Sequence, residues 1–139
     1  MYKSNLPQVE SRMRAASFAG LEAAAAVYEN AVKDELRGGY TSGDFVTGQS
    51  VSAVAHSEPE MDSDGAFILV GTSLLHNLYW ELGHQNLFTR RFERVEKWVP
   101  TFYRTREQQL AAFQRVYLRF MGGGAGGFGS RAASLRSPR

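Results

Sequence analysis

One long helix, predicted over residues 6–37, constrains the fold of this chain more than any other feature. Pro7 suits its first turn, and Gly38 with Gly39 suits its end. Apolar residues recur along it at helical spacing in two series, which together cover an arc of about 200°. The first series is Phe18, Leu21, Ala25, Tyr28 and Val32, and the second is Val9, Met13, Ala16, Ala24, Val27 and Ala31. We expect one half of this wide arc to lie on a sheet and the other on a neighbour, which can be another subunit. The small residues of "AGLEAAAA" permit a close approach.

Two strands are predicted after this helix. Small apolar residues alternate with other residues over 50–59, which indicates a strand. The sequence "DSDG" at 62–65 indicates a turn. The continuous apolar run at 66–71 indicates a central, well-covered strand. We therefore expect a hairpin that joins the two strands.

A short helix is predicted over residues 74–82, with Thr72 or Ser73 as its cap and Gly83 as its stop. Its apolar side consists of Leu74, Leu75, Leu78, Tyr79 and Leu82, and the other side carries His76, Trp80 and His84. Either the loop 84–99 folds back over Trp80, or Trp80 anchors a subunit interface, where tryptophan is enriched.

The last predicted helix spans about 102–121, with Thr105 and Gln108 as a capping box. Leu110, Phe113, Tyr117 and Phe120 share one of its faces. The glycine-, serine- and arginine-rich residues 122–139 are predicted to be a flexible tail. The order of elements predicts an α+β domain over residues 1–121. In it, a long N-terminal helix and a C-terminal helix pack on a small antiparallel sheet, with a short helix and a long basic loop.

Charge is unevenly distributed, although the net charge of the 139 residues is only +2. Residues 41–70 hold five acids and no Lys or Arg, whereas residues 71–121 hold eight bases and four acids. An acidic end and a basic end suit head-to-tail subunit contacts or a basic surface that faces a polyanion. The chain has no cysteine and no apolar run long enough to span a bilayer. We expect a soluble protein that is made in a cytoplasm.

Catalysis finds little support in the sequence. His76, Glu81 and His84 could be drawn as metal ligands, but on a helix Glu81 points about 140° away from His76. The nearest acids to Glu81 lie in the arginine-rich loop, so we expect an ion pair with an arginine rather than a catalytic carboxylate pair. No motif for a nucleophile, a phosphate-binding loop or a zinc protease occurs. We expect neither an enzyme nor a cofactor, and a hydrolase that uses Glu81 and His84 is the least favoured hypothesis.

Nucleic-acid binding is a stronger alternative, because the loop 84–99 alternates arginines with aromatic residues. No motif for sequence-specific recognition accompanies it. The candidate interface residues are Trp80, Glu81, Arg90, Arg91, Phe92, Arg94 and Trp98.

The ordered motifs resemble those of the tail-completion or neck proteins of long-tailed double-stranded DNA phages, which join head to tail. The similar segments are Thr47 with Gly48, Val70 with Gly71, the segment "YWELG" with Tyr79, Glu81 and Gly83, and the segment "PTFYR" with Pro100, Phe102 and Arg104. The resemblance covers about residues 6–121, and the segment between Gly83 and Pro100 is longer than is usual in the family.

The resemblance implies a structural virion protein that is made in the bacterial cytoplasm and placed in the phage neck. Its implied partners are copies of itself in a hexameric or dodecameric ring, the connector or stopper proteins, and the tail terminator or tail-tube proteins. Non-specific contact with DNA in the channel is also implied, and no membrane, cofactor or catalysis is expected. A tail terminator or stopper protein of the same neck is an alternative.

Overall fold

The predicted long helix is confirmed as α1 (Leu6–Leu36) in the computed structural model, which describes residues 5–40 and 48–123. Pro7 lies in its first turn. Beyond its last turn, Gly39 adopts a φ of 76° and donates a backbone hydrogen bond to Leu36 O at 3.0 Å. A left-handed glycine of this kind ends a helix, because most other residues are strained in that conformation.

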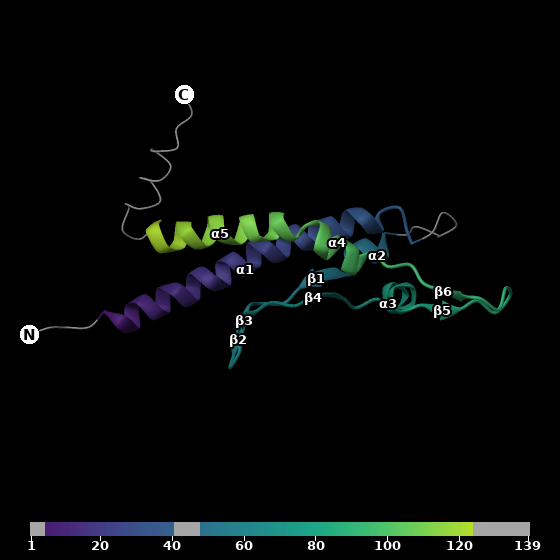
Figure 1. The fold of residues 1–139 in the computed structure, drawn as a ribbon, viewed down its shortest axis with the longest axis horizontal. Helices are drawn as coiled ribbons and strands as arrows, with labels where there is room; N and C mark the ends of the chain where they lie inside the picture. Colours follow the sequence, from purple (N-terminus) through teal and green to yellow (C-terminus); the bar gives the residue numbers. More distant parts are fainter. Residues whose placement is uncertain (1–4, 41–47, 124–139) are drawn as a thin grey trace, which may run out of the picture.

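Helix α5 (Arg106–Gly123) runs antiparallel beside α1 along most of its length (Figure 1). The two helices come close where Gly20 faces the ring of Phe113. A Cβ on Gly20 would lie 2.7 Å from Phe113 Cδ2. Ala16 and Ala25 of α1 and Ala112 of α5 are also buried. The close approach expected from the small residues of α1 is therefore present.

The predicted helix over 102–121 is two helices, so its predicted start is wrong. Helix α4 (Trp98–Arg104) begins earlier than predicted and ends at Arg104, and Thr105 separates it from α5. The Thr105 hydroxyl donates to Thr101 O at 2.8 Å and accepts from Gln109 Nε2 at 2.9 Å. These two hydrogen bonds replace the predicted capping box of Thr105 with Gln108. The Thr105 hydroxyl bonds to the residues four before and four after it, at the point where the helix is interrupted. Leu110 and Phe120, expected on one face with Phe113, are exposed.

The predicted hairpin is present but interrupted. Strand β1 (Val54–His56) pairs with β4 (Val70–Thr72), and β2 (Glu60–Asp62) pairs with β3 (Gly65–Phe67), all antiparallel. Between these two ladders, residues 57–59 lie opposite residues 68–69. Three residues thus face two, as in a β-bulge. Pro59 has no N–H to donate. The prediction of one central strand over 66–71 is wrong, and Leu69 is exposed.

The predicted strand over 50–59 is wrong in its first half. Gln49–Ser52 form the helical turn α2, which starts at Gly48 with a φ of 82°. Val51 and Val54, three residues apart, both pack in the core. A helical turn places such a pair on one side, whereas a strand would place them on opposite sides.

The core lies on the C-terminal half of α1. Val32, Leu36, Tyr40 and Val54 form its buried centre, and Tyr28, Val51, Trp80, Val95 and Trp98 pack around it. At the other end of α1, Leu6, Val9 and Met13 are exposed. The fold is therefore α+β, as predicted, with two long helices and three small two-stranded sheets in the described residues.

Glu29 links α1 to the first strand. Its carboxylate accepts a hydrogen bond from Lys33 Nζ at 2.7 Å and contacts His56 Nδ1 of β1. Partial burial acts to raise the pKa of Glu29, but the contacts with Lys33 and His56 outweigh it and hold the pKa below its ordinary value of 4.5.

Replacing Gly20 tests the contact between α1 and α5. Gly20→Val should lower the free energy of unfolding by about 1–3 kcal/mol, because the added methyl groups displace the Phe113 ring. Urea unfolding followed by circular dichroism measures this free energy. Gly38→Val is the matched control, since a Cβ at Gly38 meets no atom within 4 Å. Equal effects of the two variants would contradict the close contact.

The Glu29 contacts predict a pH dependence of stability. A carboxylate with a depressed pKa stabilises the fold above its unfolded pKa and loses that contribution as pH falls through the folded pKa. Glu29→Gln should therefore lower the free energy of unfolding at pH 7, and the difference from wild type should shrink below about pH 4.5. Urea unfolding at several pH values measures it. Glu22→Gln, at an exposed position of α1, is the control. A difference that stays constant down to pH 3 would contradict this role.

Candidate functional site

Helix α3 (Leu75–Leu82) faces the core with its polar side. Asn77 is completely buried, and its Nδ2 donates to Thr72 Oγ1 at 3.0 Å and to Ser50 O at 3.4 Å. The apolar side points outward: the exposed residues Leu75, Leu78, Tyr79 and Leu82 form what we call the outer leucine face. An apolar helix stripe ordinarily faces the core. Here the amide of Asn77 fixes the opposite orientation.

The N-terminus of α3 also differs from the prediction. Leu74 occupies the N-cap position, and neither Thr72 nor Ser73 caps the helix with a side chain. Instead Thr72 Oγ1 accepts a hydrogen bond from Leu74 N at 3.1 Å. Thr72 therefore orients the chain just before the helix and, through Asn77, its first turn.

Trp80 is partly buried and packs against the core. Its indole stacks on the Tyr40 ring and contacts the rings of His76 and His84 edge-on. Trp80 O accepts a hydrogen bond from Val95 N at 3.1 Å, and Val95 packs on the core. The predicted loop 84–99 therefore folds back over Trp80 through Val95, which was one of the two interpretations.

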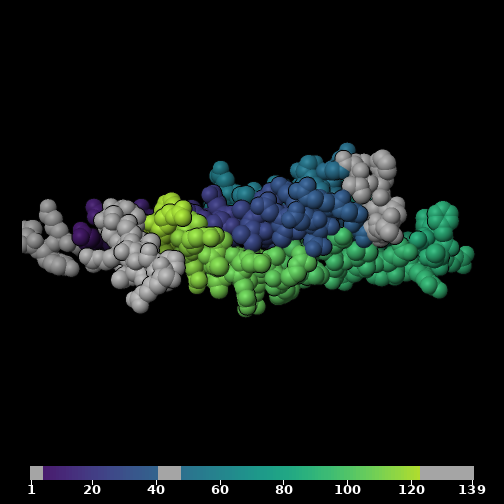
Figure 2. Space-filling view, turned by 90° about the horizontal axis from the view of Figure 1, so that it is seen from above, coloured from purple at the N-terminus to yellow at the C-terminus, as the bar shows by residue number. Residues whose placement is uncertain are grey.

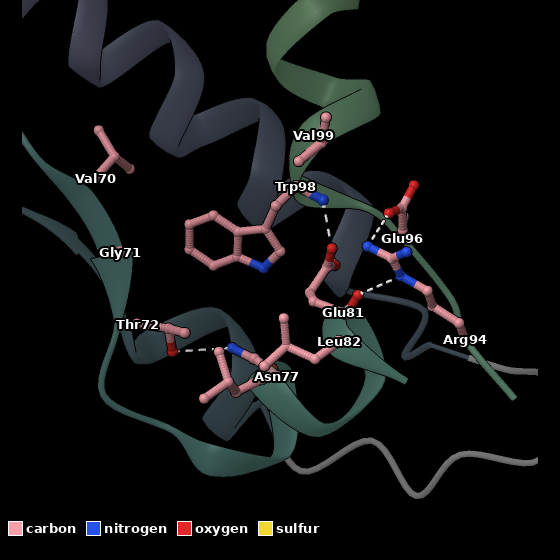
Figure 3. A pocket seen from close by; sticks show the side chains of 11 residues that line it. Val70, Gly71, Thr72, Asn77, Glu81, Leu82, Arg94, Glu96, Trp98 and Val99 are labelled. Atoms are coloured by element: carbon pink, nitrogen blue, oxygen red, sulfur yellow. Dashed lines mark hydrogen bonds and ion pairs between the residues drawn. The ribbon is translucent and has the colours of Figure 1, made fainter. Parts of the chain in front are cut away.

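Glu81 joins the end of α3 to the start of α4. Its Oε1 accepts hydrogen bonds from Lys97 N at 2.8 Å and Trp98 N at 3.2 Å (Figure 3). A carboxylate at a helix N-terminus satisfies backbone N–H groups and complements the helix dipole. Arg94 donates to the backbone oxygen of Glu81 at 2.8 Å and forms its ion pair with Glu96. Within the described residues, the Glu81 carboxylate is therefore bonded to backbone N–H groups in place of the predicted ion pair with an arginine of the loop, and a pair with an arginine of a neighbouring copy stays a prediction.

Tyr28 holds α4 against α1. Its hydroxyl donates to Trp98 O at 2.8 Å, and its ring meets Trp98 and Phe102 edge-on. Burial, and secondarily the charge of Glu81, raise the pKa of Tyr28 to about 12. The phenol therefore stays neutral and keeps donating at physiological pH. Arg104, the last residue of α4, adds an ion pair to Glu35 at 2.8 Å.

The predicted basic loop contains a short hairpin, β5 (His84–Gln85) paired with β6 (Phe92–Glu93). We call residues 84–93 the arm. It follows Gly83, whose φ is 89°, and a Cβ on Gly83 would lie 2.3 Å from the Phe92 ring. The arm extends beyond the C-terminal end of α1 (Figures 1 and 2). At its tip Leu87 is 87% exposed and Phe88 is 100% exposed.

A pocket of about 400 Å³ lies between β4, α3 and α4, at the base of the arm (Figure 3). Its lining residues are Val70, Gly71, Thr72, Asn77, Leu78, Glu81, Leu82, Arg94, Glu96, Trp98 and Val99. Asn77 Oδ1 and Trp98 Nε1 are buried and have no hydrogen-bond partner in the part of the chain that the structure describes. The walls are thus mainly apolar, with one acceptor and one donor left unpaired.

The candidate residues predicted from the sequence fall into two groups. Some belong to the pocket and the arm, and the others belong to the supporting helices and turns, which we call the scaffold. The pocket or its walls include Gly71, Glu81, Arg94 and Trp98, and the arm carries Arg90, Arg91 and Phe92. The scaffold includes Gly48, Trp80, Gly83, Pro100, Phe102 and Arg104, and Tyr79 stacks on His84 at the surface. Thr47 and residues 124–139 of the predicted tail lie outside the described residues.

Sequence reasoning missed the importance of Asn77, Leu87 and Phe88. Asn77 shares the inward side of α3 with Trp80, three residues later, and that spacing could have indicated it. Asn86 before the tip could have indicated a tight turn, because asparagine side chains accept hydrogen bonds from the backbone that follows them.

His76, Glu81 and His84 do not converge. Trp80 contacts both histidine rings, and the Glu81 carboxylate is turned to α4. Within residues 5–40 and 48–123, no three His, Cys, Asp or Glu side chains are grouped closely enough to hold a metal ion. None of the helices described has the length and apolar character needed to cross a membrane.

Glu81→Ala tests the link between α3 and α4. The variant should lose about 1–2 kcal/mol of unfolding free energy, because it removes the acceptor for two backbone N–H groups at the start of α4. Glu81→Gln keeps an acceptor oxygen and should lose less. Glu96→Ala, which removes a solvent-exposed partner of Arg94, is the control and should change stability by less than about 0.5 kcal/mol. Urea unfolding measures all three variants, and a Glu81→Ala protein as stable as Glu96→Ala would contradict this role.

No protein-family model, curated protein or solved structure matches this chain. Membership of the phage neck family therefore stays a prediction from the spaced motifs.

Proposed function

We propose that the chain is a structural subunit of a phage neck, forming or joining a ring at the head–tail junction around the DNA channel. The observation that carries the proposal is the outer leucine face of α3. Leu75, Leu78, Tyr79 and Leu82 are 78%, 48%, 49% and 64% exposed on one helix of eight residues. Contiguous apolar surface of this kind is typical of a protein–protein interface rather than of a free monomer surface.

Two further features support a subunit of an assembly. The arm extends beyond the C-terminal end of α1 (Figure 2), and Phe88 at its tip is fully exposed. At the other end of α1, Leu6, Val9 and Met13 form a second exposed apolar series. Separate apolar surfaces at different places favour heterologous contacts, which close into a ring when the rotation between copies allows it.

The family resemblance supports the phage neck as the assembly. In this proposal the protein is located in the virion, and its partners are copies of itself, connector or stopper proteins, and tail terminator or tail-tube proteins. No catalytic activity or cofactor is assigned. A tail terminator or stopper role at the same junction would use the same surfaces.

Non-specific nucleic-acid binding is the second candidate function. Its support is the exposure of Arg90 and Arg91 on the arm, next to Phe88 and Phe92. Guanidinium groups bind phosphates, and aromatic rings stack on bases. Arg94 contributes less, because it is engaged with Glu81 and Glu96.

Assembly can be tested through the outer leucine face. The protein should form a ring, or enter one when connector or tail proteins are added, as seen by light scattering and negative-stain imaging. Leu82→Ser should weaken that association about 10- to 100-fold, because it removes a leucine that the contact would bury.

Leu118→Ser is the matched control for this test. Leu118 lies on α5 and is 52% exposed, close to the 64% of Leu82. Its replacement should leave assembly unchanged, and both variants should keep the wild-type melting temperature. A monomer that enters no ring, but binds DNA in a salt-sensitive manner, would favour the second candidate function.

A further inference from the structure

We propose that the tip of the arm of one copy inserts Leu87 and Phe88 into the pocket between α3 and α4 of the next copy. In this contact Arg90 and Arg91 approach the acidic β2–β3 hairpin of the receiving copy. The inference rests on the proposed function, since it needs the chain to be a subunit of an assembly. The inference adds that the arm tip of one copy meets the pocket of the next.

The tip is built to hold its two apolar side chains in solvent. Asn86 organises it: its Oδ1 accepts from Phe88 N at 2.9 Å and from Thr89 N at 3.2 Å. Asn86 also pairs through its backbone with Arg90 and Arg91, each at 2.8 Å. Arg90 completes the turn with a φ of 58°. A turn fixed in this way loses little conformational entropy when it binds, which favours a role in recognition.

The arm does not place this tip in its own pocket. Its base lies beside the pocket, where Arg94 forms part of the wall and bonds to Glu81. From that base the paired strands β5 and β6 lead the tip away from α4 and beyond the end of α1 (Figure 1). Gly83 and Phe92 fix this direction, because any side chain at position 83 would collide with the Phe92 ring. Within the described residues, Phe88 remains fully exposed.

The pocket suits an apolar side chain carried on a peptide. Its volume of about 400 Å³ is in the range of small-ligand pockets. Leu78, Leu82 and Val99 on its rim are 48%, 64% and 53% exposed, so an inserted aromatic ring would cover them. Its walls also contain Asn77 and Trp98, each with one unpaired polar atom.

Charge complementarity favours a second copy as the occupant. Arg90 and Arg91 flank the apolar tip, and both are exposed. On the receiving side, the β2–β3 hairpin and the residues just before it expose Glu58, Glu60, Asp62 and Asp64, and residues 41–70 contain no Lys or Arg. Glu60 pairs with Phe67, which is three residues from Val70 in the pocket wall, no more than about 11 Å along the backbone. Asp62 and Asp64 lie farther from the pocket, towards the turn of the hairpin. An arm that fills the pocket therefore brings its arginines toward Glu58 and Glu60 of the receiving copy.

We infer a heterologous contact, in which the arm and the pocket of one copy engage two different neighbours. Each copy would then give an arm to one neighbour and receive an arm from the other, and the series ends when the ring closes. In a two-fold symmetric dimer, by contrast, two copies would exchange their arms with each other, and the series would end at two.

Chemical cross-linking tests the proposal directly, because the chain contains no cysteine. Thr89→Cys places a thiol on the tip and leaves Phe88 in place, and Val99→Cys places one on the pocket rim. A short bismaleimide reagent applied to the assembled double variant should give a ladder of covalent oligomers on a denaturing gel. Adding Phe88→Ser should reduce the cross-linked fraction at least tenfold. The pair Thr89→Cys with Leu118→Cys should give no ladder.

Other outcomes overturn the proposal and remain distinguishable from failure of the proposed function. Rings without a cross-link would overturn the arm-in-pocket contact and leave the neck assignment intact. A covalent dimer with no higher bands would show a two-fold contact instead. If Phe88→Ser weakens retention on DNA and the paired thiols do not react, the arm is a nucleic-acid element. A chain that neither cross-links nor assembles with itself or with neck proteins would overturn both proposals.

Discussion

Packing against the C-terminal half of α1 is the constraint on which the rest of the structure depends. The strands are two or three residues long and form only two-stranded ladders, which are not stable by themselves in water. α1 contacts α2, α4, α5, β1, β3 and β4, and Val32 and Leu36 are at the buried centre of the core. The helix therefore provides the apolar surface on which short elements become ordered.

The link between α3 and α4 determines which surfaces remain outside. Asn77 turns the polar side of α3 inward, and Glu81 fixes the end of α3 to the start of α4. Tyr28 then fixes α4 to α1 through Trp98. Asn77 and Glu81 make four hydrogen bonds from the inward side, so the leucines of α3 lie on the outside. Leu78 and Leu82 become part of the rim of a pocket, beside the base of an arm that carries its own exposed aromatic residue.

The link between α3 and α4 explains Glu81 as a structural residue, without a catalytic role. A carboxylate in an aromatic environment resembles a catalytic group when the sequence alone is considered. In the structure its oxygen accepts two backbone N–H groups that would otherwise lack a partner at the start of α4. The surfaces that depend on this link, the outer leucine face, the pocket and the arm, are those to which we assign assembly.

The sequence by itself determined the long helix, its glycine stop, the hairpin and the α+β class, because helical spacing and turn residues act locally. It also placed Gly83 at the end of α3 and indicated that the following segment could cover Trp80. Only the tertiary structure decided the inverted α3, the bulged strand and the break at Thr105. Each depends on a partner far away in the chain or on competition between backbone and side-chain hydrogen bonds: Ser50 for Asn77, Ser57 opposite Leu69, and Thr101 with Gln109 around Thr105. Periodicity shows which residues share a side of a helix, but which side faces inward is decided by what the rest of the fold brings against it.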